Sequence, residues 1–296
     1  MKKIYFLILT LLWITGDAFS QSFYQYKRDY KLSVFGGFGI SGYYGDLNNP
    51  GDIIDLSGSL TVGGSYKFHP RFSARAQLSY IRVSGKDTDL DEDLQTRVRN
   101  LSFKSDLIEF AGLGVYQFIN RNPSYYRTPR LSAYAMGGLA LTYGEPKAEY
   151  QGETYKLREI ETEGESYSAL NIALPLGLGA TYAINEFIHV GAEGLYRWTF
   201  TDYLDDVSTV YIDNSTFTDP IHAALADRRQ ELGLEPAEAG NIRGNPDKND
   251  GYFTLNLIVR YYIPVYPYSR PSGKVKRNKQ IQYKAPKPPK KRKRRF

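Results

Sequence analysis

The sequence of 296 residues contains no cysteine, three histidines and two tryptophans. Without cysteine the chain has no disulfide framework, no thiolate metal centre and no thiol nucleophile. Beyond its first twenty residues it also lacks any apolar stretch of the ~20 residues that a membrane-spanning helix needs. These absences exclude a disulfide-stapled fold, a cysteine-based site and a bundle of membrane helices.

Residues 1–20 have the pattern of a secretory signal peptide. Two lysines precede an apolar run over 4–14, and Ala18 and Ser20 supply the small residues before a cleavage site at Gln21. The apolar run is too short to cross a bilayer. We therefore expect the mature chain to begin near Gln21 and to leave the cytoplasm.

Tyrosine, phenylalanine and glycine are abundant, and apolar and polar residues alternate along much of the chain. In 169–184, for example, leucine, isoleucine, alanine and tyrosine occupy one face and asparagine, glycine and threonine the other. A period of two is typical of half-buried strands. The pattern predicts eight strands, at 31–45, 57–68, 71–81, 103–119, 130–143, 169–184, 187–200 and 252–263.

The connections alternate in length. Short ones at 69–70, 120–129 and 185–186 are interleaved with long polar ones at 46–56, 85–102, 144–168 and 202–251. This alternation is typical of bacterial barrels with short periplasmic turns and long extracellular loops. The predicted fold is an all-β, eight-stranded antiparallel transmembrane barrel of the outer-membrane type over 31–263, after a periplasmic segment at 21–30.

A soluble, lipocalin-like barrel is the structural alternative, because alternation alone does not say which face points inward. Two features favour the membrane: aromatic residues cluster near strand ends, as in interface girdles, and the polar face is rich in small residues that suit a narrow lumen. We expect the protein to lie in the outer membrane, in contact with its lipid. The long loops should then be extracellular and both termini periplasmic.

Charged residues on the polar face are the candidates for chemistry inside the barrel. We interpret them as a structural network, since an unpaired buried charge is expensive, with a catalytic site as the alternative. No serine–histidine–aspartate arrangement or metal-ligand spacing accompanies them, and the glycines of 37–42 lie within a strand rather than before a helix. We thus predict no catalytic, metal or cofactor residues. The predicted lumen network is Arg71, Arg75, Glu109, His189, Glu193 and Arg197.

The fourth long loop begins with a cluster of acids around a tyrosine: Asp202, Tyr203, Asp205 and Asp206. Calcium is one interpretation, but the spacing is not that of an EF-hand and the glycine is missing. We predict a turn in which the carboxylates accept nearby backbone amides. Further on, Asp219 and Pro220 predict the start of a helix over 220–232, ended by Gly233, with a stripe of Ile221, Ala224, Leu225 and Leu232.

The segment 264–296 follows the last strand at Pro264 and has no acidic residue. Its prolines and charge predict an extended, disordered tail. Export removes it from nucleic acid, so the alternatives are an inert tail and a periplasmic docking segment that charge steers toward acidic protein surface, anionic lipid or peptidoglycan. We favour docking. Its cations are Arg270, Lys274, Lys276, Arg277, Lys279, Lys284, Lys287, Lys290, Lys291, Arg292, Lys293, Arg294 and Arg295.

Three stretches resemble one family: Lys31–Gly37 with Tyr43–Asn48, Thr201–Ser208, and Arg243–Asn245 with Asn249–Tyr252. They are similar to the PorG-like outer-membrane proteins of the Bacteroidota type IX secretion machinery, and related barrels share some of them. The resemblance covers roughly 30–263 and leaves the tail unmatched. It implies a non-enzymatic component that links the periplasmic ring of PorK and PorN to the outer membrane.

Two other functions stay open at this stage. One is a barrel enzyme, a lipid acyltransferase or protease with its site at the extracellular rim, and the other is a surface adhesin or small pore. A narrow eight-stranded barrel has too little interior for bulk transport, which counts against a secretion pore.

Overall fold

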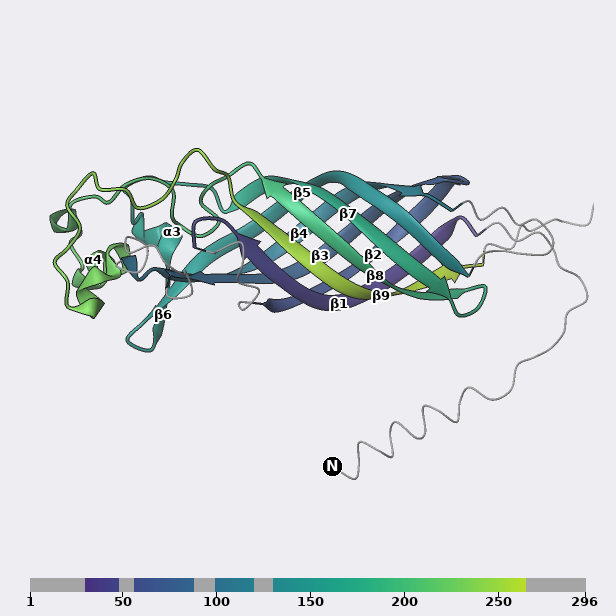
Figure 1. The fold of residues 1–296 in the computed structure, drawn as a ribbon, viewed down its shortest axis with the longest axis horizontal. Helices are drawn as coiled ribbons and strands as arrows, with labels where there is room; N and C mark the ends of the chain where they lie inside the picture. The colour runs from purple at the N-terminus through teal and green to yellow at the C-terminus, as the bar shows by residue number, and fades with distance from the viewer. Residues whose placement is uncertain (1–29, 48–55, 88–98, 120–129, 265–296) are drawn as a thin grey trace, which may run out of the picture. The chain divides into compact units, whose positions relative to one another are not determined.

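The computed structural model describes residues 30–47, 56–87, 99–119 and 130–264. Eight long strands form one antiparallel sheet that closes on itself through the pairing of β4 with β5, as Figure 1 shows. The elements in chain order are β1 (Leu32–Tyr44), β2 (Ser57–His69), β3 (Phe72–Lys86), β4 (Ser102–Gln117), β5 (Leu131–Tyr150), β6 (Glu153–Lys156), α3 (Leu157–Ile160), β7 (Leu170–Ala183), β8 (Ile188–Thr199), η2 (Asn214–Thr216), α4 (Pro220–Ala226), η3 (Arg228–Leu232) and β9 (Gly251–Ile263).

The barrel strands follow one another in sequence around the wall, and the first strand, β1, pairs with the last, β9, from Leu32 opposite Ile263 to Tyr44 opposite Gly251. Closure leaves the eight barrel strands without a free edge. The prediction of a closed, eight-stranded antiparallel barrel is confirmed. The additional strand β6 pairs only with the far end of β5 and lies outside the ring.

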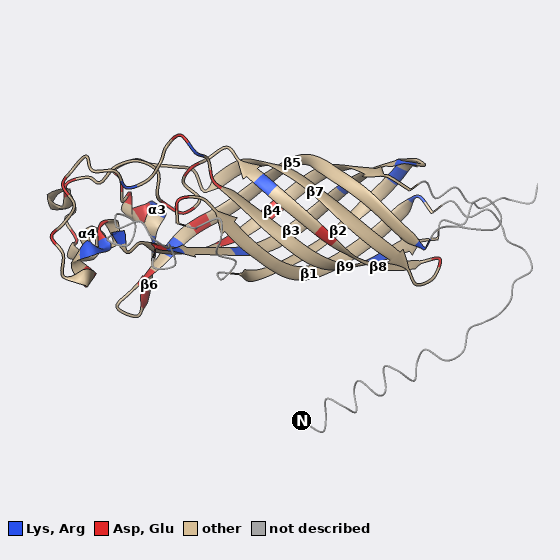
Figure 2. Cartoon of the chain, viewed as in Figure 1, with Lys and Arg blue, Asp and Glu red and all other residues tan. Residues whose placement is uncertain are grey.

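Apolar side chains cover the outside of the barrel. Phe38 on β1 is 65% exposed and Leu178 on β7 is 63% exposed, whereas the buried residues of the wall include Ser33, Thr181 and Glu193. A soluble barrel has the opposite arrangement, with its apolar face inside. Figure 2 shows that charged residues are sparse on the barrel wall and numerous on the connections at one end.

Several strands are longer than the sequence pattern predicts. β5 has 20 residues and β3 has 15, whereas about 9–11 suffice for a tilted strand to cross a bilayer. The extra length of β5 lies in the predicted loop 144–168, where its far end forms a hairpin with β6. That loop is therefore partly a β-hairpin. In the described part of the chain, no helix is long and apolar enough to span a membrane.

The long connections gather at one end of the barrel, here called the loop end, and the turns at 69–72 and 184–187 lie at the opposite turn end with the start of β1 and the end of β9 (Figure 1). We call residues 45–47, 87, 99–101, 151–168 and 200–250 the loop cap. The predicted signal peptide, most of the segment 21–30, the connection 120–129 and all but the first residue of the tail lie outside the described residues, and the predictions about them stay predictions.

The predicted helix over 220–232 is two pieces. The side chain of Asp219 caps α4 by accepting the amide of Ile221 at 2.9 Å, as the sequence indicates, and Gly233 ends the segment at a φ of 72°. Between them Asp227 interrupts the helix, because its carboxylate accepts the amides of Arg229 and Ala237. The apolar stripe breaks as well, since Leu225 is buried and Leu232 is 50% exposed.

Candidate functional site

Ion pairs fill the lumen toward the turn end. Arg75 on β3 donates from its two Nη atoms to the carboxylate of Glu193 on β8, at 2.7 and 2.8 Å. Arg260 on β9 approaches the same carboxylate at 3.3 Å, and the hydroxyl of Tyr134 donates to it. The Arg75 guanidinium also lies 3.8 Å from the ring centroid of Phe35. All five side chains are buried, so they close this level of the lumen.

A second group lies nearer the loop end. Arg197 on β8 donates to the carboxylate of Glu109 on β4 at 2.8 and 3.0 Å, and to the hydroxyl of Thr254 at 2.6 Å. Tyr252 donates to Glu109 at 2.9 Å and lies 2.9 Å from the hydroxyl of Thr142. Bidentate arginine–carboxylate pairs combine charge with a fixed geometry. They tie opposite walls of the barrel together.

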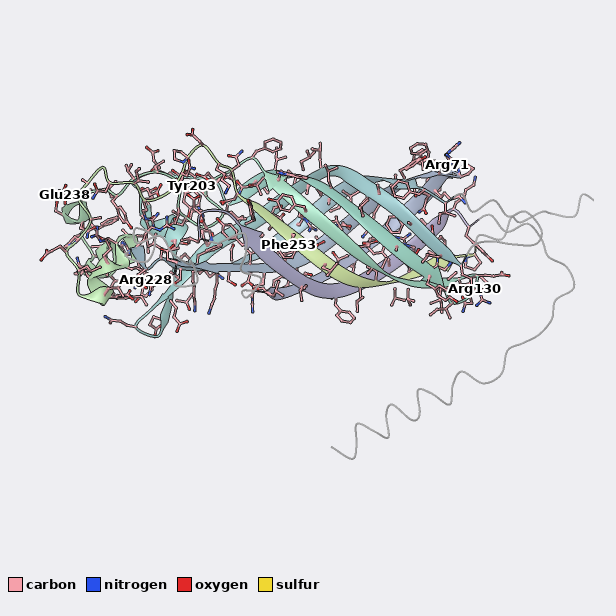
Figure 3. The ribbon with its side chains drawn as sticks, in the orientation of Figure 1. Arg71, Arg130, Tyr203, Arg228, Glu238 and Phe253 are labelled. Carbon is pink, nitrogen blue, oxygen red and sulfur yellow. The ribbon has the colours of Figure 1, made fainter. Side chains whose placement is uncertain are left out.

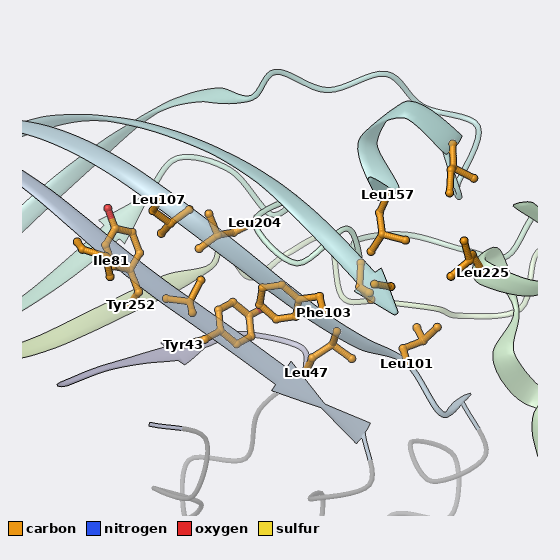
Figure 4. Packing of buried hydrophobic residues seen from close by; sticks show 14 residues of the cluster. Tyr43, Leu47, Ile81, Leu101, Phe103, Leu107, Leu157, Leu204, Leu225 and Tyr252 are labelled. Carbon is orange, nitrogen blue, oxygen red and sulfur yellow. The ribbon is translucent and has the colours of Figure 1, made fainter. Parts of the chain in front are cut away.

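The loop cap has an apolar core that continues from the barrel mouth (Figure 4). The ring of Tyr43 at the end of β1 packs edge-on against Phe103 on β4, with 4.8 Å between centroids. Around them lie buried residues of the cap and of the adjoining strand ends, including Leu47, Leu101, Leu157, Ile160, Leu204, Val207 and Leu225. The cap is therefore a packed unit with its own buried side chains.

One hydroxyl lies between two buried carboxylates in this cap. The oxygen of Tyr43 is 2.6 Å from Asp205 Oδ2 and 2.5 Å from Asp250 Oδ1. The other carboxylate oxygens accept backbone amides, Val207 to Asp205 and Leu204 to Asp250, each at 2.9 Å. A phenol has one hydrogen to donate, so the second short contact requires a proton on one of the two aspartates.

The surroundings favour that extra proton. Burial, together with the neighbouring carboxylate of Asp46, raises the pKa of Asp250 to about 7, although its hydrogen bonds and Lys248 act in the opposite direction. Burial and the charge of Asp250 raise the pKa of Asp205 well above its usual value. The pair therefore keeps one proton close to neutral pH.

Arg243 links the start of the fourth long connection to the third. Arg243 donates to Glu163 at 2.8 Å and lies 3.6 Å from Asp206. Asp206 also accepts the hydroxyls of Tyr167 and Thr162, both at 2.5 Å. Burial raises the pKa of Asp206 to about 6 against the opposing effect of Arg243.

A second arginine ties the β3–β4 connection to the same region. Arg99 donates to Asp87 at 2.6 and 3.0 Å, and also to the backbone carbonyls of Asp46 and Arg243. The Arg243 and Arg99 pairs thus join all four long connections, each through its described residues.

Comparison with known proteins identifies the family. Residues 18–218 match the outer membrane protein beta-barrel domain. The chain belongs to this family. It is an outer-membrane β-barrel protein, and no curated protein matches its sequence.

Solved barrels with low sequence identity are similar to it. Neisserial surface protein A is 11% identical, with a TM-score of 0.38, over 78% of this chain and 97% of that one. OprG from Pseudomonas aeruginosa is 11% identical, with a TM-score of 0.39, over 80% and 98%. Ail, the attachment invasion locus protein of Yersinia pestis, solved with the heparin analogue sucrose octasulfate, is 12% identical, with a TM-score of 0.38, over 78% and 97%.

The structure of this outer-membrane barrel brings most of the predicted lumen residues together. Arg75, Glu193, Glu109 and Arg197 form the two ion-pair groups, and His189 is buried beside Tyr262, with 4.6 Å between ring centroids. The prediction for Arg71 is wrong. β3 begins only at Phe72, so Arg71 belongs to the preceding turn, where it is exposed and 3.4 Å from the hydroxyl of Tyr116.

The fourth-loop motif is a turn of the predicted kind, but its carboxylates do more than accept local amides. Asp205 accepts the amide of Val207 as expected, and Asp205 and Asp206 also hold distant parts of the cap through Tyr43 and Arg243. Burial raises the pKa of Asp202 to about 8. The ring of Tyr203 stacks on Tyr167 at 4.7 Å.

Sequence reasoning missed Arg260, Arg243 and Asp250. Arg260 has a detectable signal, because it shares a face of β9 with the buried Asn256 and Ile258. Arg243 and Asp250 lie in a long loop without periodicity, and only their presence in the family-like phrases marked them.

The three histidines lie in separate regions: His69 in a turn at the turn end, His189 in the lumen and His222 on α4 in the loop cap. Among the described residues, no three histidine or acidic side chains are arranged to hold a metal ion. Nothing in the family or in the described geometry points to an enzymatic activity.

Proposed function

We propose that this barrel is a non-enzymatic component of the type IX protein secretion machinery that anchors a PorK/PorN-like periplasmic ring to the outer membrane. Residues 264–296 act as the docking segment. The observation that carries the proposal is the charge of this segment: thirteen lysines and arginines with no acid, starting where β9 ends.

The place where the tail begins supports docking. β9 ends at Ile263, opposite Leu32 at the start of β1, so the tail leaves the barrel at the turn end. In outer-membrane barrels of this kind the short turns face the periplasm. A basic segment that begins there lies in the periplasm, the compartment of the proposed ring. Its charge steers it toward acidic protein surface.

The filled lumen favours an anchor over a channel. The Arg75–Glu193 and Arg197–Glu109 pairs occupy the interior at two levels, and an eight-stranded barrel leaves little space beyond its own side chains. An anchor requires neither a transport path nor a catalytic site. What it requires is a barrel that stays fixed in the membrane and a segment that binds.

Deleting 264–296 tests the proposal. We expect the truncated barrel to reach the outer membrane and to keep its heat-modifiable electrophoretic mobility, while secretion of type IX cargo and co-purification of the ring proteins are lost. A matched control keeps the length and prolines of the tail but replaces its lysines with glutamine, and should fail in the same way if charge does the binding. Unchanged secretion and ring association after deletion would refute the docking role.

Crosslinking identifies the partner directly. A photoreactive residue at Lys279 or Tyr283 should capture a ring protein in intact cells, whereas the same group at Glu186, in the β7–β8 turn, serves as a control for proximity alone. Capture of peptidoglycan instead would replace the ring with the cell wall as the anchor point.

A further inference from the structure

The outer wall of the barrel contains a hollow where three strands lack bulky side chains. Ala74 on β3 is paired with Gly114 on β4, which is paired in turn with Gly137 on β5. Gly112 lies in the next outward-facing position of β4. Together with larger neighbours these residues line a hollow of about 610 Å³, within the roughly 300–1,000 Å³ of ordinary ligand sites.

The walls of the hollow are apolar and face the bilayer. Phe72 and Tyr116 form one side, with 5.2 Å between their ring centroids, and Leu176 on β7 contributes to another. Phe72 is 44% exposed and Leu176 47%, so both belong to the lipid-facing surface. Because this surface lies in hydrocarbon, an apolar chain is the occupant that fits it.

The positively charged side chain of Arg71 lies at one end of the hollow. The exposed Arg71 lies 3.4 Å from the hydroxyl of Tyr116, which is one of the walls. Its surroundings at the turn end are basic, with Lys31, Lys67 and Arg130 against the single acid Glu186 among the described residues there. Figure 3 shows Arg71 and Arg130 at this same end. Basic groups at a membrane surface favour anionic headgroups.

We propose that this hollow binds one anionic phospholipid, with an acyl chain against Ala74, Gly112, Gly114 and Gly137 and the headgroup phosphate on Arg71. Charge argues for lipid over a second copy of the chain. A two-fold symmetric contact through the hollow would bring the two copies of Arg71 toward each other, and like charges oppose that arrangement. This inference is independent of the proposed role in secretion.

Glycines of the wall provide the test variants. A Cβ at Gly112 meets nothing within 4 Å, and one at Gly114 meets only the carbonyl of Gly137 at 3.8 Å. Leucine at 114 therefore fills the hollow without a clash in the backbone. Gly36 on β1 is the matched control, because its Cβ position is also free within 4 Å and it lies outside the hollow.

The experiment is native mass spectrometry of the full chain in detergent, titrated with phosphatidylglycerol or phosphatidylcholine. We expect the wild type to retain one phosphatidylglycerol. Gly114→Leu should weaken its binding about ten-fold, the effect of displacing some two methylene groups, and Gly36→Leu should leave it unchanged. Arg71→Gln should lower the preference for phosphatidylglycerol over phosphatidylcholine about five-fold, whereas Lys104→Gln, at an exposed lysine near the loop end of β4, should preserve it.

Three results would overturn the proposal. They are equal retention of the two lipids by the wild type, undiminished binding by Gly114→Leu, and a dimer of the wild type that Gly114→Leu converts to a monomer without loss of lipid. Heat-modifiable mobility reports folding of each variant, and Gly112→Leu replaces Gly114→Leu if the latter does not fold. Because the measurement uses purified protein, it is unaffected by failure of the secretion proposal.

Discussion

The shared proton between Asp205 and Asp250 makes the stability of the loop cap depend on pH. The hydroxyl of Tyr43 lies within 2.6 Å of both carboxylates and supplies one hydrogen for two contacts. With the second proton in place, every donor and acceptor in this group is satisfied. Without it, two charges face one hydroxyl in a buried site, an arrangement that is costly.

The direction of the effect follows from the pKa. The pKa of Asp250 is about 7 in the folded cap and near ~4 when the cap is open. A raised carboxyl pKa means that the closed cap binds the proton more tightly than the open cap. The contribution of this proton to the stability of the cap is therefore complete below about pH 4 and is lost as pH rises toward 7. Each pH unit in this window removes about 1.4 kcal/mol. Over three units the loss is at most about 4 kcal/mol.

The assay is hydrogen exchange of the full barrel in detergent between pH 5 and pH 9, corrected for the intrinsic exchange rate. The amides of Leu204 and Val207 donate to the two carboxylates and report opening of the cap, while the amide of Gly194 on β8 reports the barrel wall. We expect protection of the two cap amides to fall as pH rises from 5 to about 8, where the titration of Asp202 adds to that of the pair, with Gly194 unaffected.

Asp250→Asn isolates the pair from the other buried acids, because Asp202 and Asp206 also have raised pKa values and change stability in the same direction. The amide mimics the protonated acid: its oxygen accepts from Leu204 and its NH₂ donates to Tyr43. This variant should be more stable than wild type at pH 8 and have a shallower pH dependence. Equal slopes for the variant and the wild type would refute the shared proton.

Three further predictions concern the barrel. Glu193→Ala leaves Arg75 buried without its partner and should cost about 3–5 kcal/mol, measured by urea titration of the folded band on gels. Gly138→Ala should prevent folding, since its Cβ would come within 2.0 Å of the carbonyl of Gly112, whereas Gly36→Ala should be neutral in the same assay. In planar bilayers the wild type should show no steady conductance, and a stable open channel would contradict a filled lumen.

Strand number and the inward and outward faces were predictable because both follow from a period of two. Glu109 and Glu193 could be placed in the lumen by parity alone, since neighbouring side chains on a strand point to opposite faces. Arg71 fails for the same reason: parity holds only within a strand, and a residue one position outside it is free to turn toward solvent. The extension of β5 was missed because its partner β6 arises from a tertiary pairing within a polar loop.

The loop cap could not be predicted, because its contacts join residues far apart in sequence. Tyr43 meets Asp205 and Asp250 at separations of 162 and 207 residues, and no local pattern encodes such a contact. The family-like phrases did contain these residues. The structure shows what residues of these family-like motifs do: the cap is held together by contacts among Tyr43, Asp205, Asp206, Arg243 and Asp250.

Opening the barrel for passage would require breaking its interior. Each of the Arg75–Glu193 and Arg197–Glu109 pairs costs about 3–5 kcal/mol to break, so the two together approach the whole stability of an ordinary domain, ~5–15 kcal/mol. The cap adds its own buried contacts above them. A molecule built in this way acts as a fixed body, and its partners must be met at its surfaces. We propose that such partners bind the basic segment 264–296 and the hollow on the outer wall.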